Sequence, residues 1–251
     1  MNISKTVGHS AHKLLVLYVF HLYNDRVKHF IDTCIFEDDH VDFIIISNDK
    51  SNVFPSPSFH NVVRLFRDNV GYDFGGWSDA LLTDNRYDKY EYFLFVNSSV
   101  SGPFIPSYCA LKWTDIYING LRGNVKLFGS TINTIEHPFD LSHVQSYIFA
   151  MNKTTLDFLI ECEIFSMTQY VATFEDAIWH REVAMSRKII SNKWNIGSLL
   201  PLYKNVDFTF ADKRPSEYDI SFVGDIMYPT FRHSLWDEYQ LVFIKGNRFR
   251  M

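Results

Sequence analysis

The sequence has 251 residues, 47% hydrophobic and 21% charged, which is the composition of a folded globular chain and excludes a disordered one. A net charge of −5 without a basic stripe excludes a phosphate-backbone binder, so we expect no nucleic-acid partner. The longest apolar run near the start, residues 14–20, is too short to span a bilayer and lacks a signal-peptide cleavage site. Three cysteines without metal-ligand spacing favour free thiols, and together these features predict a cytoplasmic protein with no transmembrane segment.

The first seventy residues have the pattern that begins a parallel sheet. Continuous β-rich runs at 14–20 and 41–48 predict strands buried on both faces. Between them, apolar residues recur at helical spacing after two candidate capping residues, Asn24 and Asp25. A short third strand is expected around residues 62–66. Strand, helix, strand, loop and strand in this order predict an open α/β sheet.

The remainder of the chain continues the same sheet. A Gly-rich segment, residues 69–77, runs into a helix, and the clearest later helix is expected at 174–190. Further strands are expected at 90–96, 125–129, 144–150 and 240–244. Because no repeat or long linker interrupts the pattern, we expect a single domain over residues 1–251, with a mixed, mostly parallel sheet flanked by helices.

Three polar loops follow predicted strands, at 47–50, 69–77 and 97–102. Ligands of open α/β sheets bind beyond the carboxyl ends of the strands, so convergence of these loops would form a nucleotide pocket. The glycines of the second loop do not have the spacing of a dinucleotide fingerprint or a P-loop. Asp73 in that loop is therefore either the N-cap of the next helix or a ligand-binding side chain.

Acidic residues on the helix predicted at 174–190 are candidates for proton transfer. Glu175 and Glu182 are two turns apart and share a helical face, whereas Asp176 does not share a face with Glu182. The transfer of a group to a hydroxyl oxygen needs one carboxylate to take the proton of that hydroxyl. A solvated helix face is the alternative interpretation.

Four basic side chains are weaker candidates. His143, at the start of a predicted strand, would either contact a bound substrate or form part of a sheet edge. His233, Lys245 and Arg248 would approach a diphosphate from the C-terminal side, or would be solvated.

Several segments together resemble a known family. They are 69–77 (NVGYDFGGW), 95–104 (FVNSSVSGPF), 143–147 (HVQSY), 182–186 (EVAMS) and 241–248 (LVFIKGNR). In this order they are similar to a set of glycosyltransferases related to the rhamnan-synthesis-protein-F family, found in bacteria, microalgae and large viruses. The resemblance extends from about residue 14 to the end.

The resemblance implies a GT-A-like fold, a nucleotide-sugar donor (a UDP-, GDP- or dTDP-sugar) and a glycan or glycoconjugate acceptor. The residues expected at the donor are Asn69, Gly71, Asp73, Asn97, Ser98, Ser99, His143, Lys245 and Arg248. The implied activity is a glycosyltransferase of polysaccharide biosynthesis. The alternative is a catalytically degenerate sugar-nucleotide-binding or scaffold protein of glycan assembly.

Metal binding is expected to be weak. GT-A enzymes usually carry an Asp-x-Asp that holds Mn²⁺ or Mg²⁺ where this chain has Asn97, Ser98 and Ser99. Hard cations prefer anionic oxygen ligands, so Asn97 and Ser99 would hold the metal weakly, with help from His233. Relatives also often carry Arg at the position of Tyr72, which weakens the case for a phosphate contact there.

For the catalytic base, GT-A enzymes commonly place a carboxylate about ten residues before a Gly- or Asn-containing turn. Glu182 stands ten residues before Asn192 and is therefore preferred. Asp176 and Glu175 are the alternatives.

Overall fold

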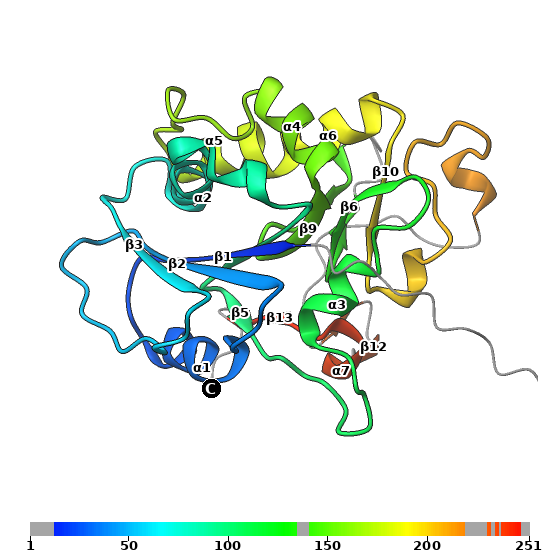
Figure 1. Cartoon of the computed structure of the whole chain (residues 1–251). Coiled ribbons are helices and arrows are strands. Elements are labelled where there is room, and N and C mark those ends of the chain that lie inside the picture. Colours follow the sequence, from blue (N-terminus) through cyan, green and yellow to red (C-terminus); the bar gives the residue numbers. More distant parts are fainter. Residues whose placement is uncertain (1–12, 135–140, 219–229, 232–233, 236, 247–251) are drawn as a thin grey trace, which may run out of the picture.

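The computed structural model describes residues 13–134, 141–218, 230–231, 234–235 and 237–246. Its centre is a seven-stranded sheet with the order β10-β6-β9-β4-β1-β2-β3 (Figure 1). These strands are β1 (Leu14–Phe20), β2 (Val41–Ser47), β3 (Val62–Phe66), β4 (Tyr92–Asn97), β6 (Val125–Gly129), β9 (Ile148–Asn152) and β10 (Asn195–Ser198). Shorter pairs are β5 (Val100–Ser101) with β13 (Ile244–Lys245), β7 (Ile132–Asn133) with β8 (His143–Val144), and β11 (Thr230–Phe231) with β12 (Ser234–Leu235).

Helices cover both faces of the sheet, with α2, α4 and α6 on one side and α1 and α3 on the other (Figure 1). The α-helices are α1 (Asp25–Cys34), α2 (Tyr72–Leu82), α3 (Trp113–Ile118), α4 (Lys153–Glu161), α5 (Phe174–Ala177), α6 (Ala184–Ser191) and α7 (Glu238–Leu241). Shorter turns are η1 (Thr83–Lys89), the π-helical η3 (Ile178–Val183), η4 (Pro201–Tyr203) and η5 (Pro215–Glu217). Within the described ranges no helix is long and apolar enough to cross a membrane, and all three cysteines are free.

The predicted parallel arrangement is confirmed. Strands β4, β1, β2 and β3 are adjacent and parallel, with Leu17 of β1 opposite Ile44 of β2 and Phe95 of β4. Strand β9 runs antiparallel between β4 and β6. This mixed, mostly parallel sheet flanked by helices is the predicted fold class and agrees with a GT-A-like fold. It brings the carboxyl ends of β1, β2 and β4 to one edge.

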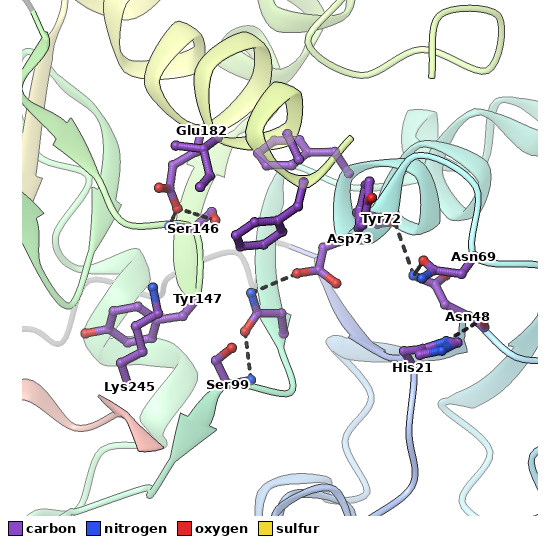
Figure 2. A pocket seen from close by; sticks show the side chains of 15 residues that line it. His21, Asn48, Asn69, Tyr72, Asp73, Ser99, Ser146, Tyr147, Glu182 and Lys245 are labelled. Carbon is purple, nitrogen blue, oxygen red and sulfur yellow. Dashed lines mark hydrogen bonds between the residues drawn. The ribbon is translucent and has the colours of Figure 1, made fainter. Parts of the chain in front are cut away.

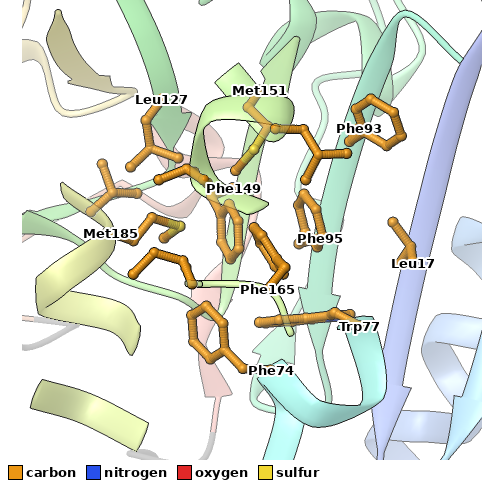
Figure 3. Close-up of a cluster of buried hydrophobic side chains, with 14 of the residues drawn as sticks. Leu17, Phe74, Trp77, Phe93, Phe95, Leu127, Phe149, Met151, Phe165 and Met185 are labelled. Atoms are coloured by element: carbon orange, nitrogen blue, oxygen red, sulfur yellow. The ribbon is translucent and has the colours of Figure 1, made fainter. Parts of the chain in front are cut away.

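Aromatic side chains fill the core between the sheet and α2. Phe95 stacks on Phe149 at 4.7 Å and on Phe165 at 5.0 Å between ring centroids (Figure 3). Trp77 of α2 packs edge-on against both Phe95 and Phe149. All four rings are almost completely buried, so the high aromatic content serves the core at these positions.

Two predicted strands are wrong in extent. The run 144–150 divides into β8 and β9, because the chain between them turns toward η3, where the backbone N–H of Ser146 donates to Glu182. The run 240–244 starts at the end of the short helix α7, continues through Val242 at φ 61°, and reaches a strand only at Ile244. Apolar runs of this length do not distinguish strand from buried helix.

The predicted helix at 174–190 is continuous but not regular. Residues 178–183 form a π-helical turn, so the two-turn spacing from Glu175 to Glu182 does not follow α-helical geometry. The two carboxylates also have different surroundings: the Glu182 side chain is 14% exposed and packs against β8, whereas Glu175 is exposed.

Trp77 provides a test of the core. Trp77→Ala should lower the free energy of unfolding by about 3–5 kcal/mol, because it empties the centre of the aromatic cluster. Trp77→Phe should cost less, since the indole N–H has no hydrogen-bond partner among the described residues and its removal leaves no group there unpaired. Val63→Ala on the exposed face of β3 is the control and should change stability by no more than about 0.5 kcal/mol. Equal losses at the two sites in urea denaturation would contradict the assigned core.

Candidate functional site

A pocket of about 260 Å³ lies at the carboxyl ends of β1, β2 and β4. The three polar loops predicted to converge all contribute to it (Figure 2). Its lining residues are His21, Asn48, Asn69, Tyr72, Asp73, Phe74, Asn97, Ser99, Ser146, Tyr147, Phe174, Ala177, Ile178, Glu182 and Lys245. This is the edge at which open α/β sheets bind ligands.

Helix α2 begins directly at the pocket, and glycines allow it to approach the sheet closely. Gly71 precedes the helix at φ 73°, a left-handed conformation that glycine adopts without strain. A Cβ at Gly75 would lie 2.0 Å from the carbonyl oxygen of Val70, and one at Gly76 would lie 2.9 Å from Val19. The Gly-rich segment therefore serves close packing that places the first turn of α2 beside the strand ends.

A buried arginine holds the loop before α2. Arg67 at the end of β3 donates from Nε to Asp79 (2.6 Å), from Nη1 to the Asn48 amide oxygen (2.8 Å) and from Nη2 to the carbonyl of Val70 (2.7 Å). Asn48 in turn donates to the Asn69 side chain and to the carbonyl of residue 72. This network fixes Asn48 and Asn69 at the pocket wall.

Asp73 lies in the first turn of α2 and is not its N-cap, because Gly71 occupies that position. Its carboxylate accepts one hydrogen bond, 3.0 Å long, from the amide of Asn97 (Figure 2). Burial raises the pKa of Asp73 to about 6; the Asn97 bond and the charge of Lys245 lower it, and Glu182 raises it. The pocket thus contains a carboxyl group that changes charge near neutral pH.

Glu182 faces the pocket from the π-helical turn η3. One of its oxygens accepts from the backbone N–H of Ser146 (2.6 Å) and from the Ser146 hydroxyl. The other lies 3.6 Å from Nε2 of His143, whose Nδ1 donates to the carbonyl of Leu141 (2.8 Å). Because Nδ1 donates to a carbonyl group, Nε2 is the ring nitrogen of His143 that faces Glu182.

The other two predicted catalytic acids lie outside the pocket. The Asp176 side chain is 40% exposed and lies 3.7 Å from His180, and Glu175 is exposed. Of the three carboxylates considered, only Glu182 lines the pocket.

Lys245 closes the pocket from the C-terminal side. Strand β13 pairs antiparallel with β5, which places Lys245 opposite Val100, and the N–H of Gly246 donates to the carbonyl of Ser99 (2.7 Å). The short pair therefore ties Lys245 to the turn that follows β4. His233 and Arg248 lie outside the described residues.

Three predicted donor-site residues support the pocket without lining it. Gly71 sets the start of α2, and the carbonyl of Ser98 accepts from Arg26 Nε (3.3 Å). His143 lies behind Glu182 and does not reach the cavity.

The residues at the expected metal position are uncharged, and they are bonded to one another and to Asp73. The amide oxygen of Asn97 accepts the N–H of Ser99 (2.9 Å), and its NH₂ group points to Asp73. Both polar atoms of Asn97 are thus engaged, and neither Asn97 nor Ser99 carries a charge. Among the residues described, no cluster of three or more His, Cys, Asp or Glu side chains could hold a metal ion.

Sequence reasoning missed His21 and Phe174 at the pocket. His21 Nδ1 lies 3.0 Å from the carbonyl of Asn48, and the 67%-exposed ring of Phe174 packs edge-on against Tyr72 at 6.1 Å. His21 directly follows the first strand, a position that could have marked it. The exposure of Phe174 has no signal in the sequence.

Comparison with known proteins agrees with this architecture. The sequence model of a family described as rhamnan synthesis protein F matches residues 43–220, more than half of the chain. The chain belongs to the rhamnan synthesis protein F family. No curated protein matches it. The match includes Asp73, Asn97 and Glu182, whereas Lys245 lies beyond it. Membership in this family associates the protein with polysaccharide synthesis.

Asp73 predicts a pH dependence of stability in this family member. A folded-state pKa of about 6, against an ordinary value of 3.8, means that releasing the proton destabilises the fold as pH rises between these values. Asp73→Asn, which cannot ionise, should have the same free energy of unfolding as the natural protein below pH 4. Above pH 6 its free energy of unfolding should be higher by on the order of 2–3 kcal/mol. Urea denaturation from pH 4 to 7.5 measures the difference. A constant difference across that range would contradict it.

Proposed function

We propose that this protein is a glycosyltransferase that moves a sugar from a nucleotide-sugar donor to a hydroxyl group of a glycan or glycoconjugate. The observation that supports this most is the convergence of Asp73, Glu182 and Lys245 in one pocket at the carboxyl ends of parallel strands (Figure 2). Such a transfer requires a proton acceptor and a positive charge near the leaving diphosphate. The family's association with polysaccharide synthesis agrees with a glycan product.

In this proposal Glu182 is the base. The acceptor hydroxyl gives its proton to Glu182 while its oxygen forms a bond to the anomeric carbon and the bond to the diphosphate breaks. Ser146 orients one carboxylate oxygen, and the other lies 3.6 Å from Nε2 of His143. A base whose side chain is itself oriented by a third group is the arrangement that proton transfer requires.

The donor diphosphate, in the same proposal, lies between Lys245 and the start of α2. Lys245 carries positive charge, and the N-terminus of the eleven-residue α2 adds a partial positive charge from its dipole. In this proposal these charges, rather than a metal ion, stabilise the leaving group, because Asn97 and Ser99 supply only neutral ligands. Asn69 and Asp73 would then hold hydroxyl groups of the donor.

Donor binding can be tested without knowing the acceptor. In a thermal-shift screen, one of the UDP-, GDP- or dTDP-sugars should raise the melting temperature, because a ligand bound only by the native state stabilises it. We expect the shift to persist in excess chelator and to diminish in Lys245→Ala. A shift that disappears with chelator and returns with Mn²⁺ would assign the charge to a metal instead.

Turnover tests the base. With the donor found in that screen, Glu182→Gln should slow transfer to water by roughly 10²–10⁴-fold while donor binding persists. Asp176→Asn, a matched removal of charge outside the pocket, should retain normal turnover. If Asp73→Asn is inactive and Glu182→Gln is not, the base is Asp73. Donor binding without hydrolysis in the natural protein would indicate a sugar-nucleotide-binding protein rather than an enzyme.

A further inference from the structure

A second and larger pocket, of about 600 Å³, lies at the side of the sheet that ends in strand β10. It is formed by the edge strand β10, its neighbour β6, the segment after α3, and η4. It shares no lining residue with the candidate functional site. Its chemistry is also different.

The floor of this second pocket is apolar. The ring of Phe128 lies between two glycines: a Cβ at Gly120 would lie 2.3 Å from the ring, and one at Gly197 would lie 2.9 Å from it. Leu199 and Val206 continue the apolar surface along the wall. The two glycines thus leave room for the Phe128 ring, which a larger residue at either position would displace.

The wall beside the edge strand is held in place by Asn195. Its amide donates to the carbonyl of Val206 (2.9 Å) and accepts the N–H of Phe208 (2.9 Å). The hydroxyl of Tyr203, farther along this wall, lies 3.1 Å from that of Thr134. These bonds fix residues 203–208 over the edge of the sheet, so the pocket is a built feature of the fold.

The charge around the pocket is one-sided. Among the residues that the structure describes, Arg122 and Lys204 line the pocket and no acidic residue does. The two segments that form most of it, 119–128 and 192–206, carry four basic residues and no acidic one, in a chain whose net charge is −5. A local excess of this sign favours an anionic group.

We propose that this pocket binds an anionic amphiphile, with an apolar chain against Phe128 and a phosphate head beside Arg122 and Lys204. The apolar floor accounts for the chain, the two cations for the head, and the volume lies in the range of pockets that enclose small molecules. The proposal does not depend on the activity proposed for the first pocket.

The test uses dodecyl phosphate, below the concentration at which it forms micelles, in isothermal titration calorimetry with the full chain. We expect one saturable site, and binding roughly tenfold weaker for dodecyl maltoside, which has the same chain and a neutral head. Arg122→Glu with Lys204→Glu should weaken dodecyl phosphate binding by at least about tenfold, since two partly exposed ion pairs each contribute a few-fold. Both side chains are exposed, so the fold should be retained.

The matched control is Lys126→Glu with Lys193→Glu. It changes charge equally in the same two segments but at residues that do not line the pocket, so binding should be unchanged. Equal losses in the two double variants would show diffuse attraction and overturn the proposal. Equal affinity for the maltoside, or no saturable site, would also overturn it. None of these three results would bear on turnover at Glu182.

Discussion

The guanidinium of Arg67 is buried where β3 ends, and its hydrogen bonds reach β2, the loop before α2 and α2 itself through Asn48, Val70 and Asp79. A buried charge is tolerated only when it is paired and its donors are satisfied, so these three elements cannot separate without exposing an unpaired group. The side chains that line one wall of the candidate site are therefore positioned by a buried ion pair. Tyr170 strengthens the same pair by donating to Asp79 (2.5 Å).

The parallel part of the fold could be predicted because its strands are buried on both faces. In β1, every residue from Leu14 to Phe20 is buried, so the hydrophobic signal is continuous and its neighbours along the sheet follow from the chain order. The misassigned segments also contain apolar runs, but contacts outside those runs determine their structure. The run 144–150 breaks at Ser146, which pairs with a residue 36 positions away, and 240–244 breaks at Val242, where φ is positive (61°). Hydrophobic periodicity contains neither kind of information.

The location of the site could be predicted for a similar reason, whereas the partners of its residues could not. Polar loops after parallel strands meet at one edge by topology alone, so Asn48, Asp73 and Asn97 could be grouped from their positions. The direction of the Glu182 side chain depends on a π-helical turn, a rare feature without a reliable sequence signal. The position of Lys245 depends on pairing between β13 and β5, two strands of two residues each. Elements this short leave no periodic pattern.

The two carboxylates of the pocket belong to different helices, yet the same scaffold holds both. Asp73 lies at the start of α2. Glu182 lies on η3, which continues from α5, and α5 follows the loop at 166–173. That loop is bound to α2 at two adjacent positions: the N–H of Ser166 donates to Ser78 (3.0 Å), and Tyr170 donates to Asp79. The spacing of the two acids is thus set by contacts outside the pocket, before any ligand binds. Groups held on packed helices keep their geometry better than groups on free loops, and a site for proton transfer needs this preorganisation.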